Sequence, residues 1–166
     1  GLETARWLAE RGARHLVLAG RSGMPARDLW DTPRSEAQRS QVAAIRRIEA
    51  LGAAVYPVSL DVTDEAAVTR LLQGEPGAAL PPVRGIVHSA GVTADCLIDR
   101  LDFASFGKVL HPKLRGSVAL ARASRGLKLD FFVLYSSLGS LLGQPGQASY
   151  AAANAFIDAL AIDLRQ

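Results

Sequence analysis

The chain of 166 residues contains little cysteine, few aromatic residues and no block of charge of one sign. Its one cysteine, Cys96, excludes an internal disulfide, and with three dispersed histidines it does not form the ligand set of a zinc site. We therefore expect no bound metal and a reducing, cytoplasmic compartment. Aromatic residues make up 6% of the chain, and 19 basic residues are interspersed with 16 acidic ones. A nucleic-acid surface needs a one-sided basic stripe with aromatic side chains, so we expect no nucleic-acid partner.

The chain also lacks charge between Asp130 and Asp158, and this stretch is long enough to cross a membrane. Polar side chains and three glycines interrupt it, and the glycines would break a helix through its middle. We therefore expect no membrane association and interpret the stretch as the buried wall of an active site. Hydrophobic residues at 49% and charged residues at 21% predict a folded globular chain, about the length of one domain.

Hydrophobic periodicity predicts helices and strands in alternation. Apolar residues at helical spacing predict helices over 2–11, 42–51, 103–123 and 148–164, with a further helix capped by Thr63. Short apolar runs predict buried strands over 15–19, 54–60, 85–88 and 131–135. Segments 22–34 and 74–82 are rich in turn-forming residues and predict loops. Pro112 is expected to bend or interrupt its helix.

This alternation predicts an α/β fold with a doubly wound, Rossmann-like parallel sheet. Ligands of such sheets bind beyond the carboxyl ends of the strands, so the candidate site lies in four loops that begin at Gly20, Asp61, Ser89 and Ser136. The expected first strand and its glycine-rich phosphate turn are missing, and Gly1 is a candidate for the last glycine of that turn. We therefore expect a sheet that is incomplete at the N-terminal strand and at the C-terminal edge.

Seven segments, taken in this order and at these spacings, carry a resemblance to a known family. They are Trp7 to Ala13 (WLAERGA), His15 to Leu18 with Arg21-Ser22-Gly23, Asp61-Val62-Thr63, His88 to Val92 (HSAGV), Pro112-Lys113, Tyr135-Ser136-Ser137 and Tyr150 to Phe156 (YAAANAF). From end to end the chain resembles the short-chain dehydrogenase/reductase superfamily, and within it the ketoreductase domains of modular polyketide synthases. The resemblance implies that residues 1–166 are part of a ketoreductase catalytic domain.

The resemblance assigns catalytic roles to Lys113, Ser137, Tyr150 and Asn154. Tyr150 would be the acid that protonates the developing alkoxide, and Ser137 would hydrogen-bond the carbonyl oxygen. Lys113 would supply the cation that a phenol needs near neutrality and would hold the nicotinamide ribose. Asn154 follows Tyr150 by four residues, so the two share a helix face and could hold a relay water. An asparagine at this position, with the lysine earlier in the chain, resembles the polyketide and animal fatty-acid synthase ketoreductases.

Small and polar residues after the predicted strands are the candidate contacts for a dinucleotide cofactor. Arg21 stands where an arginine would accept the 2′-phosphate of NADPH, whereas an acidic residue would bind the ribose hydroxyls of NAD. NADPH is therefore the expected cofactor. By resemblance, the other cofactor contacts are Gly1, Ser22, Asp61, Val62, Ser89, Ala90, Gly91, Lys113 and Tyr150, with Asp61 and Val62 beside the adenine.

The stereochemistry of the product is a finer expectation from the same resemblance. Ketoreductases of the B-type, which usually give the D-hydroxyl, have a Leu-Asp-Asp signature and a proline five residues before the tyrosine. The opposite group has a tryptophan eight residues before the tyrosine. Here the signature reads Thr93-Ala94-Asp95, Pro145 is present and Leu142 stands in the tryptophan position, which favours the B-type.

The predicted function is the reduction of a β-ketoacyl thioester on an acyl carrier protein to the β-hydroxyacyl thioester. The carrier protein and the other domains of the same synthase are the expected partners. Two alternatives stay open: a non-catalytic module, suggested by the missing glycine turn, and an animal-type fatty-acid synthase ketoreductase. Structural roles also stay open, because Arg21 could be an ordinary surface arginine and Asp61 could begin a helix-capping segment. His88, on a buried strand, is expected to be a satisfied core histidine.

Overall fold

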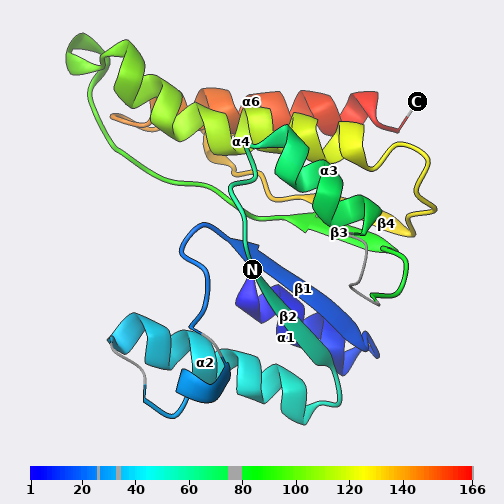
Figure 1. Ribbon diagram of the computed structural model, residues 1–166. Helices are drawn as coiled ribbons and strands as arrows, with labels where there is room; N and C mark the ends of the chain where they lie inside the picture. The colour runs from blue at the N-terminus through cyan, green and yellow to red at the C-terminus, as the bar shows by residue number, and fades with distance from the viewer. Residues whose placement is uncertain (26, 33–34, 75–79, 166) are drawn as a thin grey trace. The chain divides into compact units, whose positions relative to one another are not determined.

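The computed structural model describes residues 1–25, 27–32, 35–74 and 80–165. The chain forms two compact units, Gly1–Asp61 and Val62–Gln166 (Figure 1). Each unit combines helices with one pair of parallel strands, which confirms the predicted α/β class and the parallel pairing of the strands.

The first unit is a β-α-β arrangement preceded by a helix. Its elements are α1 (Leu2–Glu10), β1 (His15–Gly20), the 3-10 turn η1 (Arg27–Leu29), α2 (Glu36–Ala50) and β2 (Ala54–Ser59). Strands β1 and β2 pair in parallel, from His15 opposite Ala54 to Gly20 opposite Ser59. The Ser35 hydroxyl caps α2 by accepting a hydrogen bond from the Gln38 amide at 3.2 Å. Because this cap stabilises the first turn, α2 begins at Glu36, before its first buried residue, Val42.

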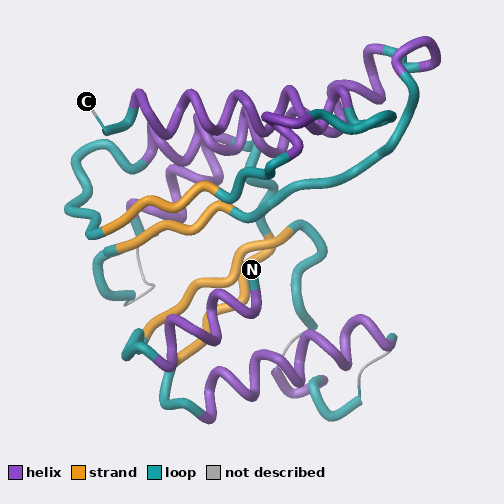
Figure 2. The backbone as a smooth tube through the Cα atoms, turned by 180° about the vertical axis from the view of Figure 1, so that it is seen from behind, coloured by secondary structure: helices purple, strands orange, loops and turns teal. Residues whose placement is uncertain are grey.

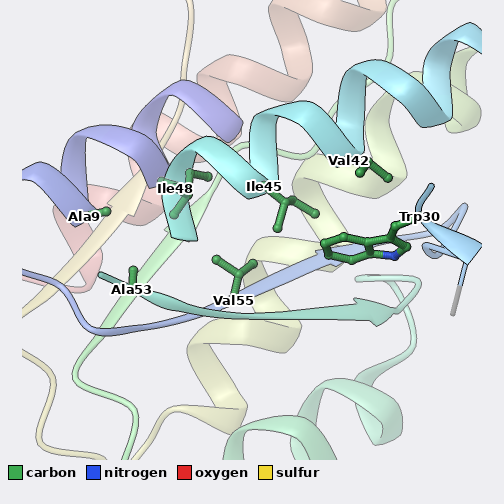
Figure 3. Packing of buried hydrophobic residues seen from close by; sticks show 8 residues of the cluster. Ala9, Trp30, Val42, Ile45, Ile48, Ala53 and Val55 are labelled. Atoms are coloured by element: carbon green, nitrogen blue, oxygen red, sulfur yellow. The ribbon is translucent and has the colours of Figure 1, made fainter. Parts of the chain in front are cut away.

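Helix α2 covers the strands with one apolar face. Val42, Ile45 and Ile48 recur at helical spacing and are almost fully buried. Figure 3 shows Ile45 and Ile48 on the side of α2 that faces Val55 and Ala53, and Val42 beside the Trp30 ring. Burial of each large aliphatic side chain contributes roughly 1.5–3 kcal/mol, so this face holds α2 in place.

The second unit carries two paired strands and the longest helices. Its elements are α3 (Glu65–Gln73), β3 (Gly85–His88), the 3-10 turn η2 (Ile98–Arg100), α4 (Phe103–Ala123), β4 (Phe131–Leu134), α5 (Gly139–Leu142) and α6 (Ala148–Asp163). Strand β3 pairs with β4 in parallel, from Gly85 opposite Phe131 to His88 opposite Leu134. Helix α4 packs against both α3 and α6. Figure 2 shows these helices alongside the two strands, which place the ends of β3 and β4 next to each other.

Most of the predicted elements are confirmed, although α2 begins at Glu36, well before the predicted start at residue 42. Pro112 does not interrupt α4, which is continuous through it. The predicted cap at Thr63 is wrong: the carboxylate of Asp64 accepts from the Ala67 amide at 2.9 Å, so the helix begins one residue later. The short helix α5 falls in a stretch that shows no helical period. Residues 26, 33–34 and 75–79 of the two predicted loops lie outside the described residues.

The loop predicted over 22–34 contains the turn η1 and is anchored by a buried tryptophan. Trp30 is 5% exposed, and its indole N–H donates to the Pro25 carbonyl at 2.9 Å. The Arg27 guanidinium lies over the Trp30 ring, 4.7 Å from its centroid, and pairs with Glu49 of α2. These contacts tie the segment to the core of the first unit, although its sequence shows no period.

No helix among the described residues is both long and apolar enough to span a membrane.

Candidate active site

Lys113 is the buried cation of the second unit. Its side chain lies on α4, the residue is 5% exposed, and the ammonium donates a hydrogen bond to the Tyr135 carbonyl at 2.6 Å. Tyr135 directly follows β4, so the end of this strand holds the lysine. Burial lowers the pKa of Lys113, whereas the negative charge of Asp158 raises it. Its Nζ also lies 5.9 Å from the centroid of the Tyr150 ring, which places the predicted cation beside the predicted acid.

Ser137 and Tyr150 flank the same position, which is occupied by Gly139. A Cβ atom on Gly139 would lie 3.4 Å from the Ser137 Oγ and 3.9 Å from the Cδ1 of Tyr150. The Gly139 amide donates to the Ser137 Oγ at 3.1 Å. The hydroxyl oxygen therefore already accepts one bond, while its own proton has no acceptor among the described residues. A substrate carbonyl oxygen is the kind of acceptor that such a hydroxyl can bind.

Asn154 is fully buried one helical turn after Tyr150. Its Nδ2 donates to the Tyr150 carbonyl at 2.7 Å, and the Ser136 hydroxyl donates to the Asn154 carbonyl at 3.4 Å. Its Oδ1 is buried without a hydrogen-bond partner among the described residues. Because an unpartnered buried acceptor is costly, this oxygen fits a bound water or another donor at the site.

Two glycines allow close packing around Lys113 and His88. A Cβ on Gly91 would lie 3.2 Å from the Cε of Lys113, so the loop after β3 passes directly beside the lysine side chain. A Cβ on Gly116 would lie 2.7 Å from a methyl carbon of Val62 and 3.3 Å from the His88 ring. Glycine at 116 therefore lets α4 pack closely against Val62 and against His88 of β3.

His88 is a buried histidine of β3 and not a free acid. It is 3% exposed, and its Nε2 lies 3.1 Å from the Pro112 carbonyl, which matches the expected core role. Burial, assisted by the positive charge of Lys113, lowers the pKa of His88 to about 4. The ring is therefore neutral at neutral pH and donates its Nε2 proton to Pro112.

Because His88 is buried with a lowered pKa, we expect the free energy of unfolding to depend on pH. Between about pH 4 and pH 6.5 the unfolded chain binds a proton at His88 and the folded chain does not, so stability rises with pH across this window. Lowering the pH from 7 to 4 is expected to remove about 3 kcal/mol of the free energy of unfolding through this residue. Urea unfolding of the wild type and of His88→Gln at both pH values measures the difference. Equal pH dependence in the two proteins would contradict the assignment.

The first unit holds four of the predicted cofactor contacts: Gly1, Arg21, Ser22 and Asp61. Arg21 directly follows β1, is exposed and forms no ion pair with any residue that the structure describes. Its carbonyl accepts from the Ser59 hydroxyl at 3.2 Å, which fixes the backbone of this turn against the end of β2. Gly1 is the N-cap residue of α1 and Asp61 closely follows β2, so these residues lie at element ends as predicted.

The remaining predicted cofactor contacts belong to the second unit. Val62 packs near Gly116, whereas Ser89, Ala90 and Gly91 follow β3 and are exposed. In the second unit, the small exposed residues after β3 and the lysine beside Gly91 are of the kind that a dinucleotide backbone and ribose require. In the first unit, the exposed Arg21 guanidinium is of the kind that binds a phosphate. Each unit, taken by itself, is therefore compatible with a nicotinamide dinucleotide.

Two polar residues at this site were not found from the sequence. The Ser140 hydroxyl lies 2.8 Å from the Ser137 carbonyl oxygen and 2.7 Å from Asp158 Oδ2. Asp158 follows Tyr150 and Asn154 at the same four-residue spacing, and this periodicity could have indicated it. Ser140 lies in a stretch of small and apolar residues without a comparable signal.

Comparison with known proteins assigns the chain to a family. The family model described as the KR domain matches residues 1–166, so the chain belongs to the KR domain family. The chain is 48% identical over 162 residues to 5-methyl-1-naphthoate synthase of Streptomyces sahachiroi and 41% identical over 168 residues to 6-methylsalicylic acid synthase of Penicillium terrestre. These matches cover 97% and 100% of the chain but 9% of each synthase.

Solved ketoreductase structures agree with this assignment. A structure of A-type ketoreductases from a modular polyketide synthase matches with a TM-score of 0.83 and 35% identity, over 99% of this chain and 32% of that one. A ketoreductase from the first module of phoslactomycin biosynthesis in Streptomyces sp. HK803 gives the same TM-score and identity, over 99% of this chain and 36% of that one. The resemblance to polyketide synthase ketoreductases and the Rossmann-like fold are thereby confirmed.

Proposed function

We propose that this chain is the catalytic part of an NADPH-dependent β-ketoacyl reductase within a multidomain polyketide synthase. Its substrate would be a β-ketoacyl thioester on an acyl carrier protein, and its product the β-hydroxyacyl thioester. The observation that carries the proposal is the grouping of Lys113, Ser137, Tyr150 and Asn154 within one compact unit, with the lysine ammonium 5.9 Å from the centroid of the Tyr150 ring. The similarity to ketoreductases of polyketide synthases supports the same reaction.

Each of these residues has a chemical task that its contacts support. The Ser137 hydroxyl donates to the substrate carbonyl oxygen, because its own oxygen is already occupied by the Gly139 amide. Tyr150 donates its phenolic proton to the same oxygen as negative charge develops there. NADPH, when bound, supplies the hydride for the carbonyl carbon. The buried Asn154 Oδ1 holds a water through which a proton returns to Tyr150.

Lys113 serves both the acid and the cofactor. Its ammonium is held by the Tyr135 carbonyl and retains two further protons for donation. One would be donated to the nicotinamide ribose, and the positive charge stabilises the tyrosinate that remains after proton transfer. Gly91 beside the lysine leaves room for the dinucleotide backbone.

Arg21 is proposed to select NADPH through its 2′-phosphate. Replacement by serine is expected to raise the KM for NADPH about tenfold or more and to leave the KM for NADH nearly unchanged, because one charge-assisted contact is lost. Steady-state kinetics with both cofactors on the parent synthase measures this effect. Arg14→Ser, an exposed arginine of the same unit, is the control. Equal changes for both cofactors would contradict the role of Arg21.

The proposed product has the B-type hand, usually the D-hydroxyl. Support comes from Asp95, from Pro145 and from the absence of tryptophan at position 142. The two signature segments also touch: the Gln147 amide donates to the Asp95 carboxylate at 3.2 Å, and the Cys96 amide donates to the Gly146 carbonyl at 2.8 Å. Chiral separation of the product determines its hand.

The experiment that tests the function is reduction of a β-ketoacyl thioester mimic by the parent chain with NADPH. We expect oxidation of one NADPH for each β-hydroxyacyl thioester formed. If the parent chain neither binds NADPH nor reduces the mimic, the chain is a non-catalytic module of its synthase.

A further inference from the structure

Asp158 is a charged residue beside the candidate site that has no part in the proposed reaction. It lies on α6 at the same four-residue spacing that separates Tyr150 from Asn154. Residues four apart share one face of a helix, so all three lie along the same side of α6. Asp158 is half-buried and is the first charged residue after the uncharged stretch that begins at Phe131.

The Asp158 carboxylate reaches the loop of Ser137 through one intervening hydroxyl. Ser140 Oγ lies 2.7 Å from Asp158 Oδ2 and 2.8 Å from the Ser137 carbonyl oxygen. Both neighbours are acceptors when Asp158 is ionised, so the single Ser140 proton is shared between them. The hydroxyl therefore connects α6 to the main chain of Ser137. The Gly139 amide binds the side-chain oxygen of Ser137, and the Ser140 hydroxyl binds its carbonyl oxygen.

The same carboxylate acts on Lys113 through its charge. Burial favours the neutral amine, and the negative charge of Asp158 opposes this effect by raising the pKa of Lys113. The other groups around the lysine are His88 of β3, the Tyr150 ring of α6 and the Tyr135 carbonyl after β4. His88 is neutral near pH 7, so Asp158 is the one anionic side chain that counteracts the burial of Lys113 among the described residues.

We infer that Asp158 is a positioning residue for this site, which rests on the proposed function. Its hydrogen bond with Ser140 fixes the main chain that carries Ser137, and its negative charge favours the ammonium form of Lys113. The two effects act on the two groups that orient and stabilise the developing alkoxide. Asp158 itself does not touch the substrate.

Two substitutions in the parent synthase separate the two effects. Asp158→Asn keeps an oxygen that accepts from Ser140 but removes the charge, whereas Ser140→Ala removes the hydrogen bond but keeps the charge. The control is Asp163→Asn, which removes an exposed carboxylate at the end of the same helix. Thermal unfolding of all variants identifies any that do not fold.

The first measurement follows the Lys113 amine directly and does not require turnover. The rate at which a small amine reagent labels Lys113 is measured against pH, by mass spectrometry of the peptide that contains it. Asp158→Asn is expected to shift this titration toward lower pH, because the negative charge that raises the pKa of Lys113 is removed. The alkaline limb of kcat/KM for ketone reduction should move in the same direction. Ser140→Ala is expected to leave the titration in place and to lower kcat about tenfold, because Ser137 is less well oriented.

An unchanged Lys113 titration in a folded Asp158→Asn protein, or equal shifts in Asp163→Asn, would overturn the inference. If Asp158→Asn does not fold, the Ser140→Ala variant decides: unchanged kcat overturns the inference, and a tenfold loss supports it. Failure of the proposed function is distinguishable, because wild-type protein would then not reduce the thioester mimic while the Lys113 titration could still be measured.

Discussion

Replacement of Tyr150 by phenylalanine is expected to lower kcat for β-ketoacyl thioester reduction by about 10² to 10⁴-fold. The change removes only the phenolic oxygen and its proton, so the developing alkoxide loses its acid. The Tyr150 hydroxyl makes no hydrogen bond with any described residue, and its loss therefore leaves no buried group unpaired. We expect the melting temperature and NADPH binding to change little. Oxidation of NADPH, followed by absorbance, measures the loss.

The matched control is Tyr56→Phe. Tyr56 lies on β2, where its hydroxyl is 3.2 Å from His15 Nδ1, and it has no part in the proposed chemistry. This variant should retain wild-type kcat. Turnover at the wild-type rate in the Tyr150 variant would refute the role of the tyrosine as the acid.

Replacement of Lys113 by methionine is expected to separate activity from stability. Without the ammonium, the tyrosinate left by proton transfer loses its stabilising charge and the ribose loses a donor, so kcat/KM should fall by about 10² to 10³-fold. Stability should be unchanged or higher, because a buried lysine carries a desolvation penalty that methionine of similar volume does not. The two measurements are ketone reduction and thermal unfolding of the same protein.

Lys108→Met is the control for this substitution. Lys108 lies on the same helix, is exposed, and is replaced by the same side chain. It should retain both activity and stability. A Lys113→Met protein that is both inactive and strongly destabilised would indicate that the lysine is structural, because its bond to the Tyr135 carbonyl would then dominate.

Much of the fold could be predicted because its signals are local. The apolar residues of α2 recur at helical spacing, and the runs of β3 and β4 are short, apolar and followed by small or polar residues. The spacing of Tyr150 and Asn154 predicts that they share a helix face, and the structure confirms it through the bond from the Asn154 amide to the Tyr150 carbonyl.

Other features could not be predicted because they depend on neighbours distant in the sequence or on small energy differences. Thr63 and Asp64 are both good capping residues, and the choice between them depends on the backbone conformation at the helix entry. Helix α5 has only four residues, too few to show a period. The four-residue spacing places Asp158 on the helix face of Tyr150 and Asn154, but its bond to Ser140 becomes visible only when α5 and α6 come together.

The sequence by itself determined the order of the strands and of the longer helices, the residue types available for chemistry and, through the resemblance, the family. Only the tertiary structure decided that Lys113 of α4 is buried beside Tyr150 of α6 and is held by the end of β4. The physical reason is that periodicity reports which face of a helix is apolar, whereas the element that covers that face is chosen by packing. The burial that lowers the pKa of Lys113, and the carboxylate that raises it, are both products of that packing.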